Sequence, residues 1–214
     1  MADGGVLQNL FGRYFRKPER IADVEALQRF MDERAAFLTQ KGIVEFCRVR
    51  AGGHWQKLFG ETEFQQALTL SRWRGYPLAL AMLAEMVEAA LRETAGVERL
   101  RLPGTLAAAA ARLTAKYPVP AGESDDFWEK SNALIAVTLA EAQSRPARAV
   151  AAMPDPLAKK FHKALPLHQN LVAPDYDYIF NFLRMNLLRA HEDFLARADR
   201  PALLSDLVGG NGRG

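Results

Sequence analysis

The chain has 214 residues, of which 49% are hydrophobic and 25% charged, and this composition excludes a disordered or collagen-like protein. Its single cysteine, Cys47, excludes an internal disulfide and a metal centre built from several thiolates. The net charge of +3 is spread evenly along the chain, which gives little driving force for nucleic-acid binding, so we expect no nucleic-acid partner.

The first 20 residues form the most distinctive segment. Residues 4–18 contain no acid, and large apolar side chains recur there at helical spacing among basic ones. Such a helix lies on an anionic membrane surface or docks into the groove of a partner, although the same pattern also fits a helix packed on its own core. We therefore expect an amphipathic basic segment over residues 1–20, with an interaction face formed by Leu7, Leu10, Phe11, Arg13, Tyr14, Phe15, Arg16 and Lys17.

Residues 21–208 are predicted to form one helical domain. A first helix begins after Asp23, a good N-cap, and reaches about Gln40. We expect Gly42 to interrupt it, and a second helix to follow over residues 43–51.

The next helical stretch has a clear start and an expected break. Thr62 and Gln65 have the spacing of a capping box. Pro77 removes a backbone donor, so we expect one helix to end before it and another to run from it to about Ala95.

The second half of the chain continues the helical pattern. One helix begins at Pro103 and ends by Pro118, and Ser124 is expected to cap the next. The remaining expected elements are short segments at 146–152 and 155–164, a loop at 165–174, a long helix from Asp175 to about Ala198, a final turn at 201–208 and a disordered tail at 209–214.

These elements predict an all-α fold: a single-domain bundle of about seven to nine helices packed at mixed crossing angles. Alternating β-branched stretches do not occur. The start has no secretory signature, and the longest apolar run is too short to span a bilayer. We therefore expect a protein that lies in the cytoplasm or peripherally on the inner face of a membrane.

The search for catalytic motifs is mostly negative. The sequence has no phosphate-binding glycine loop and no nucleophile elbow, and the His191-Glu192 pair lacks the second histidine of a zinc protease because residue 195 is Leu195. Arg72-Trp73-Arg74 interleaves an aromatic ring with two cations, but three residues are weak evidence for a nucleic-acid surface. We expect no cofactor and no metal.

Three residues define an alternative pocket: Glu85, Glu88 and His191. The two acids lie one turn apart in an apolar helix, where they could bind a cation or act as an acid of raised pKa. The competing interpretation pairs Glu88 with Arg92 and places both acids at the solvent edge of the helix. His191 falls on an apolar helix face, where a buried core histidine is the commoner case.

Two functions follow from these patterns. The first is a non-catalytic helical interaction protein, such as an adaptor, an assembly factor or a peripheral membrane protein, whose partner is another protein or an anionic membrane surface. The alternative is a helical protein or enzyme that binds a small molecule or lipid in a pocket near Glu85, Glu88 and His191.

Overall fold

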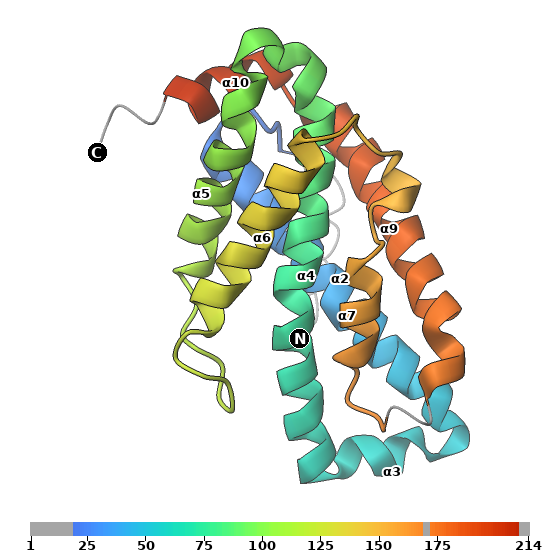
Figure 1. Ribbon diagram of the computed structural model, residues 1–214. Helices are drawn as coiled ribbons and strands as arrows, with labels where there is room; N and C mark the ends of the chain where they lie inside the picture. Colours follow the sequence, from blue (N-terminus) through green and yellow to red (C-terminus); the bar gives the residue numbers. More distant parts are fainter. Residues whose placement is uncertain (1–18, 169–171, 210–214) are drawn as a thin grey trace, which may run out of the picture.

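The computed structural model shown in Figure 1 describes residues 19–168 and 172–209. The prediction of an all-α fold is confirmed, because these residues form helices and turns but no strand. Six helices have ten or more residues: α2 (Val24–Ala51), α4 (Thr62–Ala95), α5 (Leu102–Thr114), α6 (Phe127–Gln143), α9 (Tyr176–Arg197) and α10 (Arg200–Gly209). Two helices, α3 (Trp55–Gly60) and α7 (Leu157–Lys163), are shorter, and the 3-10 turns η1 (Gly52–His54), η2 (Gly96–Arg101), η3 (Val150–Ala152) and η4 (Ala173–Asp175) connect the elements.

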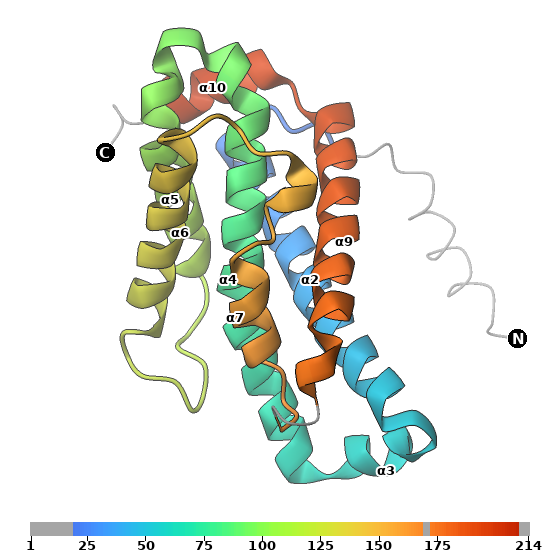
Figure 2. The same cartoon turned by 45° about the vertical axis from the view of Figure 1, so that its right-hand side comes forward.

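Helix α4 is the axis of the bundle. Figures 1 and 2 show it passing through the middle, with α9 on one side, α5 and α6 on the other, α2 crossing behind it and α10 across one end. Every residue from Tyr76 to Glu88 is buried. A helix that is buried all round cannot show a polar face, which explains the long apolar run in this part of the sequence.

The predicted count of seven to nine helices is wrong, because two expected breaks do not occur and the bundle has six main helices in the described residues. Gly42 lies inside α2, where a Cβ would come within 2.7 Å of the Phe182 ring on α9. Gly75 lies inside α4, where a Cβ would be 3.1 Å from atoms of Phe161 and Thr39. Both glycines therefore allow neighbouring helices to approach closely and do not end a helix.

Pro77 also lies inside α4, although proline costs a helix interior about 3 kcal/mol. Its ring is buried among the apolar residues of the core. Burial of a large apolar side chain is worth about 1.5–3 kcal/mol, and the ten buried side chains of this kind along α4 outweigh the missing hydrogen bond. The break expected at Pro77 is thus overridden by packing between helices.

Of the three predicted N-caps Asp23, Thr62 and Ser124, only Asp23 caps its helix. The Asp23 carboxylate accepts a hydrogen bond of 2.7 Å from the Ala26 amide, so Asp23 is the N-cap of α2 as predicted. Thr62 and Ser124 do not cap their helices: α4 begins with Thr62 after Glu61, and α6 begins after Asp126, in both cases without a side-chain cap. Of the short segment expected at 146–152, only residues 150–152 form a regular element, the 3-10 turn η3.

Residues 19–22 join the body between α2 and the α9–α10 corner. The Ile21 side chain is fully buried, and its backbone exchanges hydrogen bonds with Arg197 and Asp199. Glu19 pairs with Arg29 at 2.5 Å and Arg20 with Asp199 at 2.6 Å. The segment at 1–18, with all eight predicted interaction residues, and the tail at 210–214 lie outside the described residues.

None of the helices in the described ranges is both long enough and apolar enough to cross a membrane.

Candidate functional site

Glu85 and Glu88 are both fully buried on α4, so the interpretation that placed them at the solvent edge is wrong. Glu88 is held by both nitrogens of the Arg92 fork, at 3.0 and 2.6 Å, and this predicted pair is confirmed. Glu85 is held in the same way by Arg148, at 2.9 and 2.7 Å, with Arg145 at 3.7 Å. Each buried carboxylate therefore faces a guanidinium in bidentate geometry, which is a strong form of charge-assisted hydrogen bond.

The two arginines also bind the backbone of the connection between α6 and α7. Arg148 donates to the carbonyls of Ala152, Met153 and Asp155. Arg92 donates to the carbonyls of Ala142 and Arg145. These contacts satisfy both ends of each ion pair and fasten residues 142–155 to α4.

His191 does not join the two acids. It lies half-buried in the last turns of α9, and burial lowers the pKa of its imidazole below the usual value, opposed by the nearby Glu192. No hydrogen bond or ion pair in the described part of the chain connects it to Glu85 or Glu88. In the same residues no group of three His, Cys, Asp or Glu side chains is arranged to hold a metal ion.

Cys47 is a fully buried residue of α2. Burial raises the pKa of its thiol to about 12, so the thiolate needed for nucleophilic chemistry is strongly disfavoured. This environment fits the role of a small core residue.

A cluster of aromatic side chains lies where α4 meets the end of α5 and the start of α6. Trp73 has edge-to-face contacts with Tyr76, Tyr117 and Trp128, with ring centroids 5.4–6.1 Å apart. The Trp128 indole donates a hydrogen bond of 3.0 Å to the Pro118 carbonyl. The cluster therefore ties the connection between α5 and α6 to α4.

Asp32 on α2 joins the two tyrosines of this cluster. Its carboxylate accepts hydrogen bonds from the Tyr76 hydroxyl at 2.6 Å and from the Tyr117 hydroxyl at 2.7 and 2.8 Å. Desolvation and these bonds raise the pKa of Tyr117 to about 12 and move the pKa of Tyr76 upward as well. Both hydroxyls thus stay protonated as donors, and the carboxylate has its charge satisfied.

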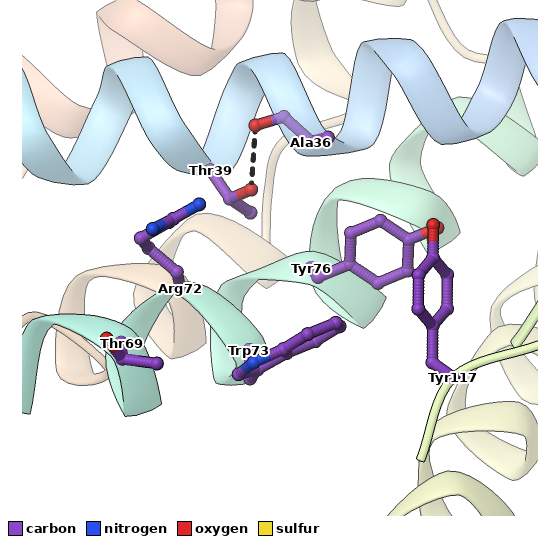
Figure 3. A pocket seen from close by; sticks show the side chains of 7 residues that line it. All are labelled: Ala36, Thr39, Thr69, Arg72, Trp73, Tyr76 and Tyr117. Carbon is purple, nitrogen blue, oxygen red and sulfur yellow. Dashed lines mark hydrogen bonds between the residues drawn. The ribbon is translucent and has the colours of Figure 1, made fainter. Parts of the chain in front are cut away.

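A small cavity of about 150 Å³ opens beside the cluster. We call it the aromatic slot, and it is lined by Ala36 and Thr39 of α2, by Thr69, Arg72, Trp73 and Tyr76 of α4, and by Tyr117. Figure 3 shows Arg72 and Thr39 at one end of the slot and the two tyrosine hydroxyls together at the other. A benzene-sized ring occupies a cavity of this volume.

A larger, mostly apolar hollow of about 850 Å³ continues from the slot, with Thr69 and Trp73 lining both. We call it the trough: one wall is α4 from Thr62 to Trp73, and the other is residues 118–122 of the α5–α6 connection. Arg74 of α4 holds this connection in place through an ion pair of 2.6 Å with Glu123. The trough is therefore a built feature with two anchored walls.

This site was not predicted from the sequence. Arg72-Trp73-Arg74 was interpreted only as weak evidence for a nucleic-acid surface, yet Arg74 is engaged by Glu123 and Trp73 lines both hollows. The spacing of Trp73 and Tyr76, three residues apart on one helix, was an available local signal for an aromatic face. Asp32 and Tyr117 join them only through tertiary contacts, so no local pattern could have identified them.

The alternative pocket at Glu85, Glu88 and His191 does not coincide with these hollows, because none of the three residues lines the slot or the trough. Comparisons of the chain with models of known protein families, with curated proteins and with solved structures found no match.

Proposed function

We propose that the chain is a non-catalytic helical interaction protein that binds a segment of a partner protein in the trough, with an aromatic side chain anchored in the aromatic slot. The observation that carries this proposal is the continuity of the two hollows through Thr69 and Trp73. A small pocket that takes one anchoring side chain, at the end of a longer apolar groove, is the usual form of a groove for a peptide or helix.

The dimensions of the trough favour a protein segment as the occupant. Its α4 wall runs from Thr62 to Trp73, which at 1.5 Å per residue is roughly 16 Å, or about three turns of a docked helix. The apolar lining includes Ala67, Leu70 and Val119, the last of which is 39% exposed. Covering these side chains supplies a hydrophobic driving force for association.

The two ends of the trough carry opposite charges. Glu63 lies at the start of α4 and Arg72 at the slot, and neither has an ion-pair partner among the described residues. A polypeptide segment with charges of both signs around an apolar face complements this pattern, whereas a lipid chain does not.

The buried charges support a non-catalytic role. Glu85 and Glu88 each have a bidentate arginine partner, and Asp32 accepts bonds from two hydroxyls. A general acid or base needs a group within reach of substrate. Here the buried carboxylates of Glu85 and Glu88 and the half-buried carboxylate of Asp32 are engaged in holding elements of the fold together.

The basic segment at 1–20 remains a second proposed interaction element. We propose the cytoplasm as the location of the protein, and we propose no nucleic-acid partner. Deletion of residues 2–18 is expected to leave the melting temperature unchanged and to abolish binding to anionic liposomes or to a protein partner. A truncated chain that melts several degrees lower would place this segment on the core of the protein instead.

Binding of a partner segment in the trough is tested by selecting random peptides, displayed on phage, against the full chain. Selected peptides are expected to share an aromatic residue and to lose binding to the variant Ala67→Glu, which puts a charged side chain into the trough. The matched control is Ala136→Glu, the same change at an exposed position of α6, and it should bind normally. Peptides that bind Ala67→Glu as well as the parent chain would overturn the proposal.

A further inference from the structure

The aromatic slot has one unsatisfied charged group at its mouth, the guanidinium of Arg72. The Arg72 side chain is exposed, extends toward Thr39 of α2, and has no acidic partner in the part of the chain that the structure describes. Its neighbour Arg74, one residue beyond Trp73, is by contrast paired with Glu123. The slot therefore presents a cation that the fold itself does not use.

The rest of the slot is suited to an aromatic ring. Trp73, Tyr76 and Tyr117 line it, and its volume of about 150 Å³ matches a benzene ring. The two tyrosine hydroxyls are donated to Asp32 and lie at the end away from Arg72, as Figure 3 shows. A ring that enters the slot thus meets aromatic and aliphatic carbon inside and a planar guanidinium at the entrance.

We propose that Arg72 selects partner segments in which an acidic group lies directly beside the aromatic anchor. A guanidinium binds a carboxylate through two parallel hydrogen bonds, a geometry that lysine cannot reproduce. Because Arg72 and Trp73 line the same small slot, the carboxylate must lie within a residue or two of the ring. This inference rests on the proposed function and names the sequence feature that the site recognises.

The chain's own basic segment does not carry this feature. Residues 4–18 contain Phe11, Tyr14 and Phe15 but no aspartate or glutamate. The expected occupant is therefore not the chain's own N-terminal segment but a segment of a partner protein.

The test uses two small probes, N-acetyl-L-phenylalanine, which carries a carboxylate beside its ring, and N-acetyl-L-phenylalanine amide, which is neutral. Each is titrated into the full-length protein, and binding is followed by the indole N–H resonance of Trp73, assigned with Trp73→Phe. We expect the carboxylate probe to bind at least fivefold more tightly than the amide. In Arg72→Gln the two probes should bind equally, at the affinity of the amide for the parent chain.

Arg112→Gln, which removes an exposed arginine of α5 outside the slot, is the matched control and should preserve the fivefold difference. Equal binding of both probes to the parent chain would overturn the role of Arg72 and leave the aromatic anchor standing. If neither probe shifts the Trp73 resonance, the anchor fails too, and with it the slot's part in the proposed function. A fivefold difference that persists in Arg72→Gln would assign the selectivity to another group and overturn the inference.

Discussion

At the scale of single residues, Asp32 is the group on which the aromatic cluster depends. It bonds to one hydroxyl from α4 and one from the end of α5, so three parts of the chain meet at one carboxylate. Hydrogen bonds to a charged group contribute about 1.5–3 kcal/mol. Their loss should therefore be measurable in the stability of the whole domain.

We expect Asp32→Asn to lower the free energy of unfolding by ~1.5–3 kcal/mol, because a neutral amide accepts weaker bonds from Tyr76 and Tyr117. Urea denaturation measures this loss. Asp125→Asn, at an exposed position of the α5–α6 connection, is the control and should change stability by less than ~0.5 kcal/mol. Equal stabilities of the two variants would show that Asp32 does not hold the cluster.

Tyr117 of this cluster and the buried Cys47 predict a loss of stability at alkaline pH. The pKa of Tyr117 and that of Cys47 are each raised to about 12 in the folded chain, from ordinary values of 10.0 and 9.0. The folded state thus holds these protons more tightly than the unfolded state. This contribution is complete below pH 9 and is lost as the pH rises toward 12.

Urea denaturation at pH 8, 10 and 11 should therefore show a falling free energy of unfolding above pH 9, and a shallower fall in Tyr117→Phe, which has no hydroxyl to titrate. An unchanged stability between pH 8 and 11 would contradict the environment described for these groups.

At the scale of elements, two glycines inside helices illustrate opposite physical situations. A Cβ at Gly42 would meet the Phe182 ring at 2.7 Å, whereas a Cβ at Gly104 of α5 would meet no atom within 4 Å. Helix propensity alone predicts that alanine stabilises both positions, by about 0.5–1 kcal/mol.

We expect Gly104→Ala to stabilise the protein by that amount and Gly42→Ala to destabilise it by ~1–3 kcal/mol, because the added methyl group forces α2 and α9 apart. Thermal denaturation of the two variants measures both changes in stability. A stabilising Gly42→Ala would mean that the two helices do not approach closely at this point.

The two buried ion pairs hold the connection between α6 and α7 against α4. Arg148 bridges Glu85 to three backbone carbonyls of residues 152–155, so the loss of Glu85's charge should free that connection. Removing one partner of a buried pair costs ~3–5 kcal/mol.

Glu85→Gln is therefore expected to lower the free energy of unfolding by up to ~3–5 kcal/mol and to speed tryptic cleavage after Arg148. The control is Glu129→Gln, at an exposed position of α6, which trypsin should cleave at the same rate as the parent chain. Slow cleavage in both variants would show that other contacts hold the connection.

At the scale of the whole molecule, the all-α fold class could be predicted from the sequence, because helical periodicity and the apolar run of the buried helix α4 are both local patterns. Asp23 placed the start of α2 correctly, since caps act within a few residues. Gly42 and Pro77 were misread as breaks, because their surroundings are set by α9, α7 and the core. Tertiary packing overrode the local preference at both places.

The site was harder to predict than the fold. Glu85 and Glu88 drew attention as isolated acids, but Arg148, the partner of Glu85, lies 63 residues away and its pairing follows no local rule. The aromatic slot and the trough combine residues from α2, α4 and the α5–α6 connection. Only the Trp73 and Tyr76 spacing on α4 was visible in the sequence.

Docking of a partner in the trough is tested by hydrogen–deuterium exchange on the full chain, with and without a peptide selected against it. We expect slower exchange confined to α4 from Thr62 to Trp73 and to residues 118–122, with α6 from residue 133 to 140 unchanged. Protection on another face of the bundle, or none on either wall of the trough, would contradict it.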